Sequence, residues 1–280
     1  MSSGYAITNA LSGLAPSAFT WSSGYTTGRD RLNDDLMDEV ASGSSSAQAS
    51  GQYLQIDLGS VTEVAAIVLL NHNLASGSCA VYIDQSTTAA FTPGPNTVTV
   101  KAASTITTTA PNQKDTILQL PQSTTATARY WRIYFTHSGT KTITLGEVLF
   151  LSSITSLSRS YTYGNSESER VVTNRVESVT GSIRSTYVAG PIRTKRFAFK
   201  DAQGESQRNE LMGMWRNTRG GTRNLLWIDT IESTSTAASA AAQTCIWGRL
   251  GDTHGWTNND YDLFDVDGFE LVSQGREVGS

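Results

Sequence analysis

The sequence predicts a mainly β protein with two tandem domains, an N-terminal jelly-roll sandwich and a C-terminal β-sandwich that carries one α-helix. Short segments rich in β-branched and aromatic residues recur along the chain, and clusters of Gly, Pro, Asn or Ser separate them. One amphipathic helical pattern interrupts these segments in the last third. The 280 residues suffice for two domains, and the hydrophobic content of 38% suffices for a core in each, which excludes a disordered chain.

The N-terminal domain is expected over residues 1–153. Its segment 52–59 alternates between apolar and polar residues as a half-buried strand does. Val64 to Leu70 is more uniformly apolar and predicts a strand that is buried on both faces. Further strands are expected at residues 79–85, 96–102, 116–122, 128–139 and 142–153.

Tyr130, Trp131 and Tyr134 form a candidate sugar-stacking platform within one predicted strand. Strand alternation would send Trp131 and Ile133 to one face, and Tyr130, Arg132 and Tyr134 to the other. At least one of these faces must belong to the core, so packing is the favoured role of the aromatic residues.

The polar segment 154–169 is expected to link the first domain to a second domain at 170–280. A strand pair should open the second domain, a helix at about 205–219 should follow, and three more strands should complete it. The expected strands are 174–190, 191–200, 224–229, 244–252 and 260–272.

Helical spacing supports this helix. Gln207, Leu211, Met214 and Trp215 fall on one face. Ser206 is a candidate N-cap, and Gly220 with Gly221 supplies a break after the last turn.

Charge is unevenly distributed along the chain. The net charge of −4 and the pI near 5.4 exclude a general nucleic-acid binder, yet nine basic and only three acidic residues lie between Arg184 and Arg223. This segment is either a solvated surface or a contact with an acidic neighbour such as the next copy in a ring. The candidate oligomer-interface residues are Arg193, Lys195, Arg196, Phe197, Arg208 and Trp215.

Three motifs within residues 5–153 resemble the discoidin (coagulation factor 5/8 type C) domain. They are Y-L-Q-I-D-L-G from Tyr53, Y-W-R-I-Y-F from Tyr130 and I-T-L-G-E-V-L-F from Ile143. The resemblance implies a jelly roll that binds glycans or lipid headgroups through loops at one end, in some members with a calcium ion in an acidic loop.

The acidic candidate for such a ligand loop is the segment GRDRLNDDLMDE, whose carboxylates are Asp30, Asp34, Asp35 and Asp38. Arg29 and Arg31 in the same segment favour a solvated acidic surface over a calcium site.

The last third of the sequence resembles the sandwich-plus-helix domain of tailed-phage distal tail and baseplate proteins. The residues that carry this resemblance are Trp215, Gly220, Gly221, Trp227, Trp247, Gly248, Arg249, Leu250 and Trp256. It implies a homo-oligomeric ring, with six copies in this family, that contacts the tail tube and other baseplate or tail-tip proteins.

Signals of catalysis are absent from the sequence, so we predict a non-enzymatic protein without a metal or cofactor. His72, His137 and His254 are scattered without metal-ligand spacing, and no P-loop, G-x-S-x-G or C-x-x-C motif occurs. We expect His72, just after a buried strand, to satisfy turn backbone. A carboxylate pair for glycoside hydrolysis stays an open alternative, since the separation of two carboxylates depends on the fold.

Cysteine use and hydropathy indicate where the chain is made. Cys79 and Cys245 fall in different predicted domains, which predicts no disulfide and synthesis in a reducing cytoplasm. The longest apolar stretch, residues 65–75, is too short to span a bilayer, so no membrane insertion is expected.

The leading hypothesis is a structural protein of a tailed bacteriophage virion, assembled in the bacterial cytoplasm, with the jelly roll projecting from a distal tail or baseplate ring. The alternative is a host-surface carbohydrate-binding module that the second domain attaches to the tail. An accessory domain of an extracellular glycosidase is disfavoured because the N-terminus lacks an export-signal pattern.

Overall fold

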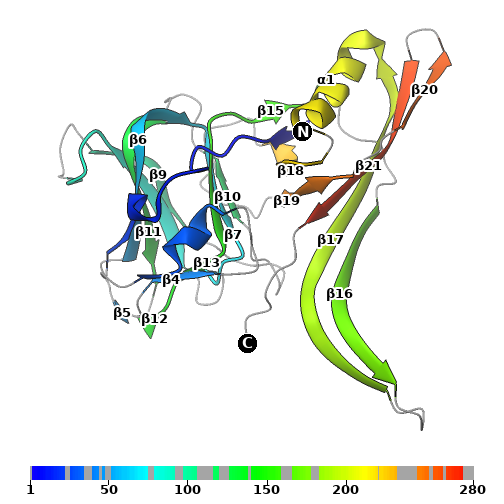
Figure 1. Cartoon of the computed structure of the whole chain (residues 1–280). Helices are drawn as coiled ribbons and strands as arrows, with labels where there is room; N and C mark the ends of the chain where they lie inside the picture. The colour runs from blue at the N-terminus through cyan, green and yellow to red at the C-terminus, as the bar shows by residue number, and fades with distance from the viewer. Residues whose placement is uncertain are drawn as a thin grey trace. The chain divides into compact units, whose positions relative to one another are not determined.

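A computed structural model describes most of the chain (Figure 1). The described residues are 2–22, 26–34, 40–43, 46–47, 52–74, 79–91, 97–105, 116–119, 126–137, 140–158, 166–177, 183–219, 221–231, 245–251, 255–260 and 263–273. The protein is mainly β, with several antiparallel sheets and one α-helix in these ranges, as the sequence predicted.

The chain forms two compact units. The jelly-roll unit contains Thr8–Thr155 and Thr230–Cys245. The helix unit contains Met1–Ile7, Ser156–Asp229 and Ile246–Ser280. The first seven residues, which the sequence pattern assigns to the N-terminal domain, thus belong to the helix unit.

Two sheets build the jelly-roll unit. The larger has the order β2 (Phe19–Trp21), β6 (Gln52–Val64), β11 (Ala126–Thr136), β8 (Ala80–Ser86) and β9 (Thr97–Thr105). The smaller has the order β10 (Thr116–Gln119), β7 (Ala66–Leu70) and β14 (Glu147–Leu151). All of these strands except β2 overlap predicted segments, which are rich in β-branched or aromatic residues and bounded by turn residues. β6 runs to Val64, past the end of its predicted segment at Gly59.

Shorter elements complete this unit. Two small sheets join β3 (Thr26–Thr27), β4 (Ala41–Gly43) and β13 (Thr144–Leu145), and β5 (Ser46–Ala47) with β12 (Thr140–Lys141). The 3-10 helices η1 (Pro16–Ala18) and η2 (Arg29–Leu32) lie in the segment before them.

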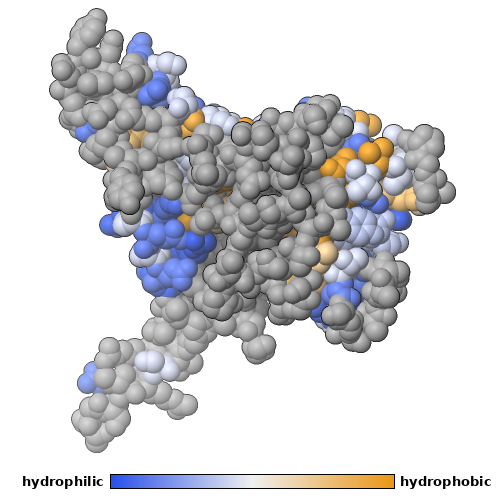
Figure 2. Space-filling model, turned by 180° about the vertical axis from the view of Figure 1, so that it is seen from behind, coloured by the Kyte–Doolittle hydropathy of each residue, from blue (hydrophilic) through white to orange (hydrophobic). Residues whose placement is uncertain are grey.

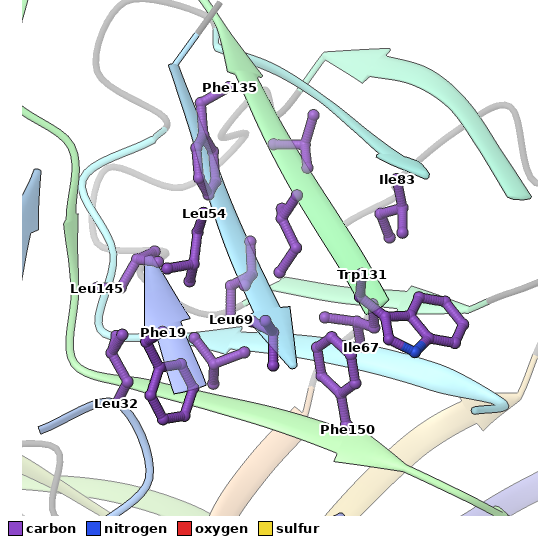
Figure 3. Close-up of a cluster of buried hydrophobic side chains, with 14 of the residues drawn as sticks. Phe19, Leu32, Leu54, Ile67, Leu69, Ile83, Trp131, Phe135, Leu145 and Phe150 are labelled. Carbon is purple, nitrogen blue, oxygen red and sulfur yellow. The ribbon is translucent and has the colours of Figure 1, made fainter. Parts of the chain in front are cut away.

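The core of the jelly-roll unit lies between the two sheets (Figure 3). Trp131 of β11 meets Phe150 of β14 edge to face, with ring centroids 5.6 Å apart. Along residues 52–58 of β6 and 131–135 of β11 every second side chain is buried, which is the two-residue period of a strand with one wet face. All five residues of β7 are buried, which confirms the predicted burial of this strand.

The helix unit is built on one sheet of eight strands. Its order is β15 (Thr155–Ser156), β1 (Ser2–Ala6), β18 (Asn224–Ile231), β19 (Cys245–Leu250), β21 (Leu263–Ser273), β17 (Ile183–Gln203) and β16 (Ser166–Glu177), and β20 (Gly255–Asp260) pairs with β21. The helix α1 (Gly204–Asn217) follows β17 directly and buries Leu211 and Met214 in the core of this unit. Phe197 stacks there on Trp227, with ring centroids 4.5 Å apart.

The sequence predicted one strand at 174–190 and a second at 191–200, and the boundary between these two strands is wrong. β17 is continuous through Gly190 and Pro191. It pairs with β16, and the register shifts between Arg170 and Val172 opposite this Gly-Pro step. A bulge on an edge-strand pair tolerates Pro, because the missing N–H interrupts no regular ladder bond.

The helix begins and ends earlier than expected. It starts at Gly204, so Ser206 lies inside its first turn and is not the N-cap. Thr218 donates its hydroxyl to the carbonyl of Trp215 at 2.7 Å, and Arg219 takes the left-handed conformation with φ 52°. The chain therefore leaves the helix at Arg219, before the glycines expected to end it; Gly221 also has positive φ, and Gly220 lies outside the described residues.

The described surface is largely polar. Val61 and Val98 are the large hydrophobic residues that the described ranges expose, and orange residues in Figure 2 occur in small groups among blue and pale ones. Among the described residues no helix is both long and apolar enough to cross a lipid bilayer. Cys79 and Cys245 are both buried and free.

Candidate ligand-binding site

Four strand ends meet at one end of the jelly-roll unit. Phe135 near the end of β11 pairs with Gln52 at the start of β6, and Leu70 at the end of β7 pairs with Glu147 at the start of β14. We call this region the loop end and define its described residues as Gln52, 71–74, 137 and 141–146. Polar side chains from separate segments gather here because antiparallel pairing brings each strand end beside its partner's start.

Asn73 organises the loop end. Its side-chain amide donates to the carbonyl of Thr142 at 2.8 Å, and its side-chain oxygen accepts from the N–H of Thr144 at 3.1 Å. Lys141 donates from Nζ to the carbonyl of Asn73 at 2.7 Å. These contacts fix the segment after β7 to the segment before β14, so the ammonium group of Lys141 has a defined position.

A second link ties the start of β6 to the same place. The amide nitrogen of Gln52 donates to the carbonyl of Lys141 at 2.8 Å and lies 3.5 Å from Nε2 of His137. Gln52 is buried, whereas His137 and Lys141 are half-buried. The loop end therefore holds His137 and Lys141 on a hydrogen-bonded base, with Nδ1 of His137 itself buried.

His72 has the structural role that the sequence predicted. It is buried, and its Nδ1 accepts from the N–H of Leu74 at 3.3 Å. Asn71 before it has φ 49°, a left-handed conformation that Asn tolerates better than most residues. This turn brings Asn73 into its bridging position.

Burial raises the pKa of the Cys79 thiol, and the nearby Lys141 partly opposes that rise. A thiol with a raised pKa stays neutral near pH 7 and is a weak nucleophile. Among the loop-end residues, the exposed Thr142 and the half-buried His137 and Lys141 carry hydroxyl, imidazole and ammonium groups, which can hydrogen-bond a hydroxylated ligand.

The structure describes part of the acidic segment. Asp30 lies in η2 and is exposed, and Asp34 is exposed just after it. Asp35 and Asp38 lie outside the described residues. No three His, Cys, Asp or Glu side chains within the described ranges are arranged to hold a metal ion.

The predicted alternation of β11 is confirmed. Trp131 and Ile133 are fully buried, whereas Tyr130, Arg132 and Tyr134 point to the opposite face and are half-buried. The Trp131 ring is therefore core and not part of a sugar platform, while the two tyrosines lie on the outer face of the larger sheet.

Two predicted interface residues in the helix unit carry ion pairs. Arg193 pairs with Glu167 of β16, and its backbone N–H donates to the Ser273 hydroxyl at 2.8 Å. Arg196 is exposed and donates from Nε to Glu270 at 2.9 Å. Both pairs join neighbouring strands of one sheet.

The other predicted interface residues are more enclosed. Phe197 is 2% exposed and belongs to the core, and Lys195 is also buried. Trp215 donates from its indole nitrogen to the carbonyl of Gly251 at 3.3 Å, and Arg208 lies 3.4 Å from Glu205 one turn earlier. The exposed Arg196 and the half-buried Arg193, Arg208 and Trp215 are the predicted interface residues with accessible surface.

Sequence reasoning missed the loop-end residues. Asn73 follows one predicted strand, Lys141 precedes another, and His137 lies near the end of a third; the first two strands are neighbours in the smaller sheet, and the third belongs to the larger sheet. The signal for these residues would have been polar side chains at the ends of strands that pair with each other. The sequence does not show which strands pair.

No family model and no curated protein sequence matches this chain. Solved structures do match it. The lectin domain of lectinolysin complexed with Lewis B antigen is 17% identical, with 52% of this chain and 97% of that chain covered and a TM-score of 0.37. The CBM32 of AlyQ in complex with 4,5-unsaturated mannuronic acid is 22% identical over 54% and 98% of the two chains, with a TM-score of 0.34.

The family 32 CBM from C. perfringens NanJ in complex with galactose is 13% identical, and the match covers 52% of this chain and 98% of that chain with a TM-score of 0.36. In this chain the jelly-roll unit is a sandwich of a five-stranded and a three-stranded sheet around one core.

Proposed function

We propose that the jelly-roll unit binds a glycan at its loop end. The observation that carries this proposal is that His137 and Lys141 lie on a base that Gln52 and Asn73 hold in place, with the exposed Thr142 next to Lys141 in the chain. A sugar offers many hydroxyl groups, and a few fixed donors and acceptors give such a ligand orientation and specificity. The sandwich supplies rigidity, so little entropy is lost when the ligand binds.

A glycan array with the labelled full chain is the first test. We expect saturable binding to one class of sugar, followed by a loss of about tenfold or more in affinity for a His137→Ala/Lys141→Ala double variant. Glu63→Ala is the matched control, because Glu63 is exposed and lies at the other end of β6 from Gln52. The proposal fails if no glycan binds, or if the double variant folds normally and binds as well as the unchanged chain.

The second candidate function is the structural role in a phage tail that the last third of the sequence implies by resemblance. One observation favours assembly of the helix unit with other subunits. In the described residues, 171–177 of β16 and 183–192 of β17 pair only with each other, as a long curved ribbon in Figure 1. An isolated two-stranded ribbon is marginally stable in water, so a neighbouring surface would stabilise it.

This candidate predicts a homo-oligomeric ring of, for example, six copies at the tail tip, in contact with the tail tube and baseplate proteins. Arg193, Arg196, Arg208 and Trp215 would meet the next copy. Sedimentation velocity over a concentration series should reveal a defined oligomer, and negative-stain images should show rings. A strict monomer at high concentration, with and without tail proteins, rejects the ring. Neither candidate function is enzymatic.

A further inference from the structure

The outer face of the larger sheet in the jelly-roll unit carries an ordered set of side chains that are not among the loop-end residues. Register places them in three rows across β6, β11 and β8. The first row is Tyr53, Tyr134 and Tyr82; the second is Gln55, Arg132 and Asp84; the third is Asp57, Tyr130 and Ser86. Figure 3 shows their chain neighbours Leu54, Ile83, Trp131 and Phe135 in the core, so these rows face outward apart from the buried Ser86.

The tyrosine row forms an aromatic strip. Tyr82 stacks on Tyr134 with ring centroids 4.3 Å apart and an interplanar angle of 6°, and Tyr53 lies 5.4 Å from Tyr134 on the other side. Burial raises the pKa of the Tyr82 phenol, with Tyr134 and Asp84 adding to the effect, so this phenol is a neutral hydrogen-bond donor over the physiological range. Such a strip offers apolar area and polar tips to a sugar ring.

Arg132 is held rigidly beside that strip. Its Cζ lies 4.3 Å from the centre of the Tyr53 ring and 4.2 Å from the centre of the Phe91 ring. Nε donates to the side-chain oxygen of Gln55 at 2.8 Å, and Nη1 lies 3.4 Å from the Tyr134 hydroxyl. Phe91 reaches this position with φ 47°, a strained conformation for an aromatic residue, and the Gln55 amide holds the preceding segment through the carbonyl of Ala89.

The guanidinium of Arg132 keeps donor capacity. A guanidinium has five N–H donors, and two of them have acceptors in the described part of the chain. Arg129, on the same strand, differs because its Nε and Nη2 donate to the two carboxylate oxygens of Asp57 at 2.7 and 2.9 Å. Among the described residues no carboxylate lies within ion-pair distance of Arg132. Asp84 is its cross-strand neighbour, but accepts instead from the Thr99 hydroxyl at 2.6 Å.

We infer that this outer face is a second glycan site, selective for a sugar that carries a carboxylate, with Arg132 as the group that binds the carboxylate. The planar fork of Arg matches a carboxylate, and charge-assisted bonds of this kind are about twice as strong as neutral ones. The sugar ring lies along the tyrosine strip, and Asp84 accepts from its hydroxyl groups. Asp84 repels any anion, but a sugar offsets this repulsion by donating its hydroxyl groups to Asp84 and packing its ring on the tyrosine strip, so the site selects an acidic sugar over inorganic phosphate or sulfate.

This inference deepens the proposed glycan function by naming a ligand class for a separate surface. The test is calorimetry on the full chain with tri-galacturonic acid, its methyl ester and inorganic phosphate as probes. We expect the acid to bind at least about tenfold more tightly than the ester, and phosphate to bind weakly or not at all. Higher salt should weaken binding of the acid and leave binding of the ester unchanged.

Two arginine variants locate the contact. Arg132→Gln should weaken binding of the acid by about tenfold or more, and Arg132→Lys should fall between, since it keeps the charge and loses the fork. Arg129→Gln is the matched control and should bind as the unchanged chain does, because Arg129 already has its carboxylate partner. Circular dichroism and the unfolding midpoint check that each variant folds.

Three outcomes overturn the inference: equal binding of acid and ester, equal loss in the Arg129 and Arg132 variants, or no binding of the acid. A sulfated trisaccharide that binds in place of the uronate would overturn the carboxylate assignment. The His137→Ala/Lys141→Ala variant separates the two surfaces. If it loses binding of other sugars and keeps the uronate, both sites stand; if no uronate binds while another glycan does, the second site alone fails.

Discussion

The longest antiparallel pairs of the two units differ in what supports them. In the jelly-roll unit, residues 52–58 of β6 and 131–135 of β11 bury every second side chain, and β8 extends the sheet beyond β11. In the helix unit, β16 has β17 as its partner strand, and its side chains at 166–170 are all exposed. Strand length therefore says little about stability. A second layer of apolar side chains decides it.

Within β17 the same difference occurs along one strand. Residues 194–203 also pair with β21, and here Phe197 and Phe199 pack against Phe269. Residues 183–192 lack that third strand in the described structure. The described buried residues accordingly form two separate hydrophobic cores, one in each unit.

Truncating core side chains should give the largest effects. It also tests whether the two cores are independent of each other. Trp131→Ala in the jelly-roll unit and Phe197→Ala in the helix unit should each cost about 3–5 kcal/mol of unfolding free energy in its own unit. Peptide-resolved hydrogen exchange in urea measures this. Tyr130→Ala on the outer face should cost about 1 kcal/mol or less. Equal loss of protection in both units from either variant would contradict independent cores.

Two glycines of the helix unit differ in whether a Cβ atom would have room. A Cβ on Gly248 of β19 would lie 2.7 Å from the carbonyl carbon of Val272 and 2.9 Å from Cα of Ser273, so Gly248→Ala should destabilise by at least about 2 kcal/mol. A Cβ on Gly213 of α1 meets nothing within 4 Å, and Gly213→Ala should stabilise by about 0.5–1 kcal/mol. Urea denaturation measures both variants, and the same sign for both would refute this account.

The smallest effect concerns the ion pair on the outer face of the jelly-roll unit. The hydrogen bond from Arg129 holds the pKa of Asp57 below its usual value of 3.8; burial opposes this shift, and the N–H of Gly59 adds to it. A lowered folded-state pKa means that the stabilisation is present above about pH 4 and is lost as the pH falls through the folded pKa.

Unfolding free energies between pH 6 and pH 2 test this. The unchanged chain should lose slightly more stability than Asp57→Asn over the acidic part of the range, and raised salt should shrink the difference because the pair is partly exposed. Identical pH profiles for the two proteins would show that the pair contributes nothing.

Part of the outer face can be predicted from the sequence alone. Alternation places Arg132 and Tyr134 opposite Trp131, and the structure confirms it. That Arg132 lies between Gln55 and Asp84 could not be predicted, because register across three strands depends on contacts more than 40 residues apart in sequence. The same holds for Asn73 and Lys141 at the loop end.

By itself the sequence determined the class of the fold, most strands, the faces that residues 130–134 of β11 occupy, and the helix to within two residues at its ends. These properties follow from local backbone geometry, whose periods of 2.0 and 3.6 residues are visible in one segment. Tertiary structure alone decided that β1 joins β15 and β18, that β17 runs unbroken through Pro191, and that the tyrosines line up in a row. Each of these depends on which distant strand becomes the partner, and the gain from burying the shared core sets that choice.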